Sequence, residues 1–368
     1  MKQENEQSRE APLASEGPAA PDAAPAAGSD AVPQPASQGA ACRAAAEAEP
    51  GASRDAREDR AAGALYALVA GSSLGCSLRQ KSRRELQVIC AQPVLPLALA
   101  KDKGYLPGQP ADECELAFVL ARCIQRQGCF RTKSVESEYR FWLSTNPPEA
   151  GHTTQSSLAG VPLQGSISNG ALQRAAAMGL HATTLSELEA ISAARRDCAI
   201  THVHRVCQDA SAVLVCGIRK AVLTGIRAAE LYDYMFQQAE DMHMAATVLT
   251  CMRKASLRVP RDFITHMGYA LIALQNALHE LLFAQSPAEG IIRTISRGGD
   301  AGANASICGA LLGAVYGASS LPSDWIEAID LCRPEAGACR VPRPRPFWPS
   351  GIRALARDLC LLGQPARA

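Results

Sequence analysis

A carboxylate in a glycine turn is the feature of this sequence with the clearest chemical potential. Gly298 and Gly299 precede Asp300, and glycine permits backbone angles that other residues avoid. The residues from Asn304 to Tyr316 are apolar or small on almost every side, which predicts a buried helix. A carboxylate where such a turn enters a buried helix is costly without a partner. We therefore predict that Asp300 belongs to a functional site.

A second acidic feature is the pair Asp112 and Glu113, which follows a turn rich in proline and glycine at residues 106–110. An apolar run typical of a helix begins at Leu116. Carboxylates are favoured at the start of a helix by its free N–H groups and its dipole. Taken alone, the pair is explained by this structural role.

Two further segments have the composition of anion-binding loops. Residues 144–154 combine hydroxyl side chains with many backbone amides, and residues 165–174 contain a Ser-Asn-Gly turn before a predicted helix. Many ordinary surface loops share this composition. His202 and His204 are two residues apart, so they would point in different directions on a helix and we predict no shared metal.

The elements that must position these residues are predicted to be helices, and the fold class is all-α. No stretch alternates with period two for long enough to indicate a strand. Apolar periodicity predicts one helix from residue 61 that ends at the glycines of 71–75, and others over 203–222, 231–252 and 261–283. Ser286 and Pro287 are typical of a helix start. After Trp325 we expect loops.

Three glycines in the predicted buried helix recur every four residues, at Gly309, Gly313 and Gly317. They leave one helix face nearly bare, so a neighbouring helix can approach closely. We expect this face to pack against another helix of the core.

The 368 residues are enough for one large domain, and the ends differ from the middle. Residues 1–60 are rich in Ala, Pro, Glu, Ser and Gln, and we predict that they are disordered. We predict a single compact helical domain over 61–350 and a C-terminal tail over 351–368.

Charge and cysteine usage limit the classes of function. The net charge of +1 gives no argument for nucleic acid or for an acidic membrane surface. We find no secretory signal and no apolar run long enough to span a membrane. The 14 cysteines include no Cys-x-x-Cys pair, which favours reduced thiols in an intracellular, most simply cytoplasmic, protein.

The order of several short motifs along the chain resembles the ADP-ribosylglycohydrolase family. The resemblance covers roughly residues 61–348, and the stretch from Gly298 to Ala314 is its most specific part. The other motifs, in chain order, are Gly63-Ala-Leu-Tyr66, Gly71-Ser-Ser-Leu-Gly75, Ala111-Asp-Glu-Cys-Glu115, Gly151-His-Thr-Thr154, Ser168-Asn-Gly-Ala171 and Thr201-His202.

This resemblance implies a compact all-α fold with a cleft for ADP-ribose and two Mg²⁺ ions. Members of the family cleave the glycosidic bond between ADP-ribose and a protein side chain, or hydrolyse related ADP-ribose compounds. The resemblance also implies that Asp112, Glu113 and Asp300 are catalytic and bind the metal. The residues that match the substrate-binding positions are Gly151, Thr153, Ser168, Asn169, Gly170 and His202.

The chain departs from the family pattern at the metal ligands. Ala111 and Ala303 stand where the family has threonines, Gly302 stands where it has an aspartate, and Glu113 replaces another aspartate. Where the family has Gly-Asp near the first helix, this chain has Gly71-Ser72. Three carboxylates with waters suffice for one Mg²⁺. Two cations about 4 Å apart repel one another without the lost carboxylate, so we expect at most one ion.

Two functions follow from these observations. The first is a glycohydrolase with impaired activity that acts on ADP-ribosylated protein or a related compound. The alternative is a catalytically inactive pseudoenzyme that binds ADP-ribose or a protein partner. A structural protein that reuses the fold without a ligand is the third and plainest option.

Overall fold

The computed structural model describes residues 52–111 and 113–361. These residues all belong to one compact unit, Cys42–Ala368. Most of the tail predicted to be disordered, together with Asp112 and the last residues of the predicted C-terminal tail, lies outside the described part of the chain.

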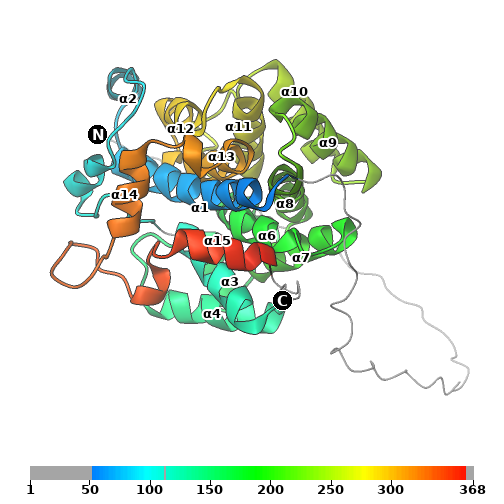
Figure 1. The fold of residues 1–368 in the computed structure, drawn as a ribbon, viewed down its shortest axis with the longest axis horizontal. Coiled ribbons are helices and arrows are strands. Elements are labelled where there is room, and N and C mark those ends of the chain that lie inside the picture. Colours follow the sequence, from blue (N-terminus) through cyan, green and yellow to red (C-terminus); the bar gives the residue numbers. More distant parts are fainter. Residues whose placement is uncertain (1–51, 112, 362–368) are drawn as a thin grey trace, which may run out of the picture. The chain divides into compact units, whose positions relative to one another are not determined.

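The described residues form helices joined by loops, which confirms the all-α prediction (Figure 1). Within these ranges there is no strand, only isolated bridges such as that between Ser168 and Tyr269. None of the described helices is both long and apolar enough to cross a membrane. The elements are α1 (Arg54–Ser77), α2 (Arg83–Ile89), η1 (Leu97–Lys103), α3 (Glu113–Gln127), α4 (Thr132–Ser144), α5 (His152–Leu158), η2 (Gly170–Arg174), α6 (Ala175–Ala182), α7 (Glu187–Thr201), α8 (Arg205–Thr224), α9 (Ala228–Asp241), α10 (Ala246–Leu257), α11 (Ala270–Phe283), α12 (Pro287–Ser296), α13 (Ala301–Tyr316), η3 (Ala318–Ser320), α14 (Ser323–Leu331), η4 (Arg345–Phe347) and α15 (Ile352–Leu361).

Helices α1 and α13 pack so closely that their backbones touch, and Figure 1 shows them side by side in blue and orange. A Cβ atom added to Gly71 would lie 2.3 Å from the carbonyl oxygen of Ala305, and one added to Gly309 would lie 2.4 Å from that of Ala67. No real Cβ fits at such distances. The bare glycine face predicted for α13 therefore contacts a helix, as expected.

The contacts show that the two helices run in opposite directions. Gly63 meets Gly313 near one end of the pair, and Gly75 meets Ala301 near the other. The C-terminal end of α1 therefore lies beside the first residues of α13, directly after Asp300. This arrangement brings two parts of the chain that are far apart in sequence to one place.

The prediction that the first helix ends at the glycines of 71–75 was wrong. Helix α1 begins at Arg54 and continues through these glycines to Ser77. Glycine is a poor helix former because it gains backbone freedom in the unfolded chain. Here the close approach of α13 requires it, and every residue from Ala61 to Gly75 is buried.

The structure corrects three other helix predictions. The helix expected over 231–252 is two helices, α9 and α10, separated where His243 has a left-handed φ of 47°. The helix expected over 261–283 begins only at Ala270, and residues 258–269 form a loop. The region after Trp325, expected to be loops, contains most of α14 and all of α15.

Helical structure therefore extends beyond residues 61 and 350, the domain limits that we predicted. The last helix, α15, buries Ile352, Leu355, Ala356 and Leu359, and it packs against α1. Its apolar residues recur at three- and four-residue steps, the period of an amphipathic helix. The predicted starts of α3 at Glu113 and of α12 after Ser286 are both confirmed.

Two of the buried ion pairs link elements that are distant in sequence. The guanidinium of Arg174 donates to the carboxylate of Asp197 at 2.9 Å, and the hydroxyl of Tyr139 donates to the same carboxylate at 2.7 Å. The guanidinium of Arg343 donates to the carboxylate of Glu115 at 2.8 Å. Glu115 thereby fastens the proline-rich segment after α14 to the start of α3.

The contact between α1 and α13 generates a stability prediction. Replacing Gly71 or Gly309 by alanine forces a methyl group against a carbonyl, so we expect each variant to lose about 1–3 kcal/mol of unfolding free energy. This loss would appear although alanine is the better helix former by about 1 kcal/mol. Chemical denaturation measures the change.

Gly165→Ala is the matched control, because no heavy atom lies within 4 Å of a Cβ added there. Its unfolding free energy should change by less than about 0.5 kcal/mol. Equal stability of Gly71→Ala, Gly309→Ala and the control would contradict the close contact.

Candidate functional site

A cavity of about 420 Å³ lies where the C-terminal end of α1 meets the start of α13. Loops 145–151 and 258–269 and the start of η2 complete its walls. Its lining residues are Ser72, Cys76, Arg79, Ala111, Glu149, Gly151, His152, Thr153, Ser168, Asn169, Gly170, Gln173, Met267, Gly268, Gly299, Asp300, Gly302 and Ala303. The cavity thus collects segments from most of the length of the fold.

Asp300 reaches this cavity from the turn that begins α13. Gly298 and Gly299 have left-handed φ angles of 78° and 67°, as expected for residues that only glycine tolerates well. The Asp300 carboxylate accepts a hydrogen bond of 3.0 Å from the Asn169 amide, and its other oxygen lies 4.0 Å from the guanidinium of Arg79. The described polar neighbours of this carboxylate are thus a side-chain amide and a guanidinium.

Asn169 links the start of η2 to loop 258–269 and to the start of α13. Its side-chain amide also donates to the Asn304 side-chain oxygen at 3.1 Å, and its backbone N–H donates to the carbonyl of Gly268 at 2.9 Å. The Asn304 amide donates to the carbonyl of Met267 at 3.3 Å. Asp300, η2 and loop 258–269 thus form one hydrogen-bonded wall.

The hydroxyl residues form a chain that leads from the cavity into the core. The Ser168 hydroxyl lies 3.1 Å from the Thr153 hydroxyl and 2.7 Å from the Nε2 atom of His202. The Nδ1 atom of His202 lies 2.8 Å from the hydroxyl of Thr201. Five of the six predicted substrate-binding residues line the cavity, whereas His202 is buried behind Ser168.

Burial decides the protonation state of His202. Loss of water contact, with a smaller effect of the Arg174 charge, lowers the pKa of His202 to about 3. The imidazole is therefore neutral near pH 7, and its two nitrogens orient the hydroxyls of Ser168 and Thr201. The imidazole thus lies behind Ser168 and holds its hydroxyl from the side of the core.

The structure describes only part of the acidic pair Asp112 and Glu113. Asp112 lies outside the described residues, and of Glu113 the structure describes its place as the first residue of α3. Their neighbour Ala111 lines the cavity, and its N–H donates to the Ser72 hydroxyl at 3.1 Å. The chain therefore reaches the cavity directly before the pair.

Sequence reasoning missed Arg79, the cationic side chain of the cavity. Its guanidinium contacts the carboxylate of Glu149 on one side and approaches that of Asp300 on the other. Arg79 follows the end of α1 within a run of basic residues that reads as an ordinary solvated segment. No spacing rule connects it with Glu149 or Asp300.

The start of α13 is tightly packed at Gly302. A Cβ atom added there would lie 2.8 Å from the sulfur of Cys76 and 3.7 Å from the Nη2 atom of Arg79. The side chains of Cys76 in α1 and of Arg79, two residues after its end, therefore fill the place where a longer side chain would project. Among the residues whose side chains are described, no group of three or more His, Cys, Asp or Glu is arranged to hold a metal.

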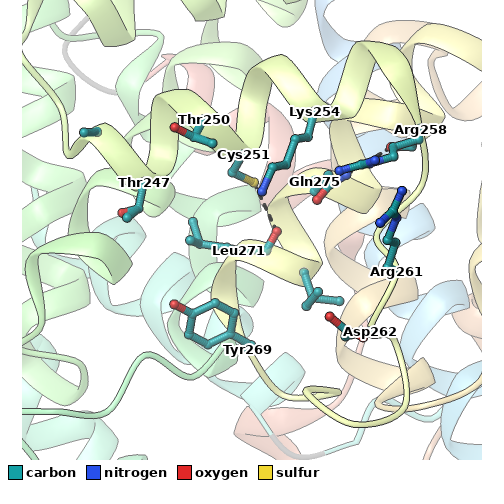
Figure 2. A pocket seen from close by; sticks show the side chains of 12 residues that line it. Thr247, Thr250, Cys251, Lys254, Arg258, Arg261, Asp262, Tyr269, Leu271 and Gln275 are labelled. Carbon is teal, nitrogen blue, oxygen red and sulfur yellow. Dashed lines mark hydrogen bonds between the residues drawn. The ribbon is translucent and has the colours of Figure 1, made fainter.

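A second cavity, of about 390 Å³, lies between α10, loop 258–269 and the start of α11 (Figure 2). It contains the cationic side chains Lys254, Arg258 and Arg261, with Asp262 as the one carboxylate among its described lining residues. None of the predicted site residues lines it. The first cavity, which brings together the carboxylate and the predicted loops, is therefore the candidate site.

The chain is similar to known proteins over most of its length. The family model described as ADP-ribosylglycohydrolase matches residues 53–366. The chain is 26% identical over 298 residues to ADP-ribosyl-[dinitrogen reductase] glycohydrolase of Rhodospirillum rubrum, covering 74% of this chain and 91% of that protein. It is also 26% identical over 314 residues to a putative ADP-ribosyl glycohydrolase of Acanthamoeba polyphaga mimivirus, covering 75% of this chain and 92% of that protein.

A solved structure has the same fold. It is described as an ADP-ribosylglycohydrolase-related protein complex, and it superposes with a TM-score of 0.64 at 22% identity. The match covers 84% of this chain and 99% of the other.

The buried imidazole generates a prediction for stability against pH. The pKa of His202 is about 3 in the folded protein and near 6.5 when unperturbed, so between these values the unfolded chain binds more protons. Its contribution to stability is complete above about pH 6.5 and is lost as the pH falls toward 3. We expect His202→Asn to show a smaller drop in Tm between pH 7 and pH 4.5 than the wild type.

The remaining pH dependence should include His181, since burial lowers its pKa to about 4. His243→Asn, at an exposed position, is the control and should keep the wild-type pH dependence. An unchanged drop in Tm for His202→Asn would show that the imidazole is not held neutral by burial.

Proposed function

Because the chain belongs to the ADP-ribosylglycohydrolase family, we propose that its cleft binds ADP-ribose, free or attached to a protein, and hydrolyses the glycosidic bond with impaired efficiency. One observation carries this proposal: the loops with the predicted substrate residues meet Asp300 at a single cavity of about 420 Å³. Ligand pockets for small molecules commonly have volumes of this order.

The groups around the cavity suit the chemistry of ADP-ribose. The hydroxyls of Thr153 and Ser168 can exchange hydrogen bonds with ribose hydroxyls or phosphate oxygens. The turn before α13 places a helix N-terminus at the wall, where backbone N–H groups favour negative charge. Glycines at 151 and 170 let a ligand approach the backbone closely.

The fit to Mg²⁺ is incomplete. Mg²⁺ prefers oxygen ligands in octahedral geometry, and Asp112, Glu113 and Asp300 would be its carboxylates here, with waters as the remaining ligands. When bound, such an ion would lower the pKa of a water and stabilise charge at the breaking bond. Gly302 and Ala303 offer no side-chain oxygen, and the Cys76 sulfur fills the space beside Gly302. We therefore propose at most one ion.

The alternative is a catalytically inactive protein that binds ADP-ribose or an ADP-ribosylated partner. The packing of Cys76 and Arg79 against Gly302 favours it, because an aspartate cannot be accommodated there without rearrangement. The cysteines of the described part of the chain form no disulfide, which suits a reducing compartment such as the cytoplasm under either function.

The first prediction of this proposal concerns binding and turnover. We expect ADP-ribose to bind the purified protein in calorimetry, and Mg²⁺ to bind weakly at no more than one site. We also expect little or no release of ADP-ribose from proteins ADP-ribosylated on arginine or serine. Two tight Mg²⁺ sites, or turnover at the 1–1000 s⁻¹ typical of enzymes, would refute the impaired cleft.

A second prediction concerns repair of the metal site. We expect the combination Ala111→Thr, Glu113→Asp, Gly302→Asp and Ala303→Thr to raise Mg²⁺ affinity only when Cys76→Gly is added. The reason is that the Cys76 sulfur would lie 2.8 Å from the new Cβ at position 302. Calorimetry of both variants tests this, with Cys76→Gly alone as the control. Equal Mg²⁺ affinity of the two combinations would show that the sulfur is no obstacle.

A further inference from the structure

Arg79 lies where several negative groups converge. It follows the C-terminal end of α1, where the helix dipole favours a cation. Its guanidinium contacts the Glu149 carboxylate, and the Asp300 carboxylate lies 4.0 Å away. The side chain is about one-third exposed, with 32% of its surface accessible, so it remains within reach of a ligand in the cavity. Among the described residues, this cationic side chain thus has the carboxylates of Glu149 and Asp300 and the end of α1 as neighbours.

The neighbouring residues make room for this guanidinium. Its Nη2 atom lies 3.8 Å from the Cys76 sulfur and 3.7 Å from where a Cβ at Gly302 would be. An aspartate at position 302 would therefore project into the space beside Cys76 and Arg79. Cys76 and Arg79 thus occupy the space that a side chain at position 302 would need.

We propose that Arg79 is the resident cation of the cleft, which binds the oxygen atoms of ADP-ribose without a metal ion. This inference rests on the proposed function and specifies how that site binds its ligand. A guanidinium presents five N–H donors in a planar fork that matches the oxygens of a phosphate or a diol. It stays charged at every physiological pH, so the positive charge needs no Mg²⁺ in solution.

The same side chain opposes metal binding. A Mg²⁺ ion held by Asp300 would lie within a few ångströms of the guanidinium, and like charges at such distances repel even in a well-solvated site. Asp300 is also occupied by the Asn169 amide at 3.0 Å. Arg79 and the ion therefore compete for the same carboxylate.

Replacement of a metal by a guanidinium changes what the cleft can do. A metal lowers the pKa of a bound water and creates a nucleophile, which a guanidinium without an open coordination position does not. The guanidinium does form charge-assisted hydrogen bonds, which are stronger than hydrogen bonds between neutral groups. Arg79 therefore supports binding of ADP-ribose and withholds the activation of water on which hydrolysis depends.

Calorimetry of ADP-ribose binding in EDTA and in millimolar Mg²⁺ tests the inference. We expect the wild-type Kd to agree within about twofold between the two conditions. Arg79→Ala should bind about tenfold more weakly in EDTA, which is about 1.4 kcal/mol and fits the loss of a hydrogen bond to a charged group. Arg79→Lys keeps the charge without the fork and should fall between the two.

Arg126→Ala is the matched control, because Arg126 forms a surface ion pair of 2.6 Å with Glu138, and neither residue lines the cavity. Its affinity for ADP-ribose should equal that of the wild type. The inference is overturned if wild-type binding disappears in EDTA and returns with Mg²⁺, or if Arg79→Ala binds as tightly as Arg126→Ala. Unchanged circular dichroism of the variants excludes unfolding as the cause.

A titration with Mn²⁺ alone, followed by electron paramagnetic resonance, separates this inference from the proposed function. Removal of the Arg79 charge should tighten Mn²⁺ binding by about tenfold, because one repulsive charge is lost. Equal Mn²⁺ affinity of Arg79→Ala and the wild type would overturn the competition. If the wild type binds no ADP-ribose in either condition, the proposed function fails, and the role of Arg79 in ligand binding fails with it.

Discussion

The close contact between α1 and α13 is the constraint on which the rest of the structure depends. The backbones touch at Gly71 and Gly309, so neither helix can slide or rotate without a clash. Because the helices are antiparallel, this contact fixes the end of α1 beside the turn at Asp300. The cavity is thus a consequence of helix packing, and the loops that complete its walls are attached to a rigid base.

Charge balance at the cavity follows from this geometry. The Asp300 carboxylate is brought into a partly buried place, with 22% of its side chain exposed, where it needs a positive or donating neighbour. Asn169 supplies a donor from one side and Arg79 a charge from the other. A protein that satisfies its own carboxylate in this way has less free energy to gain from a metal ion.

The helices and part of the site could be predicted from sequence, because their causes are local. Apolar periodicity and caps located α3, α8, α12 and α13, and the order of motifs located Asp300, Thr153, Ser168 and Asn169. The failures have causes outside the local sequence. The glycines that were expected to end α1 serve a partner helix more than 200 residues away, and Arg79 meets Glu149 only after folding.

The contact of α1 with α13 has an evolutionary consequence. It is made by backbone atoms and missing side chains, and most of it, from Gly63 to Gly71 on α1, lies away from the residues that directly follow Asp300. Exchanges at position 303 therefore leave most of this contact unchanged, whereas a larger side chain at position 302 meets Cys76. A fold held in this way tolerates changes among the residues that line its cavity, because the contact that fixes the cavity's base is made mostly elsewhere along the two helices.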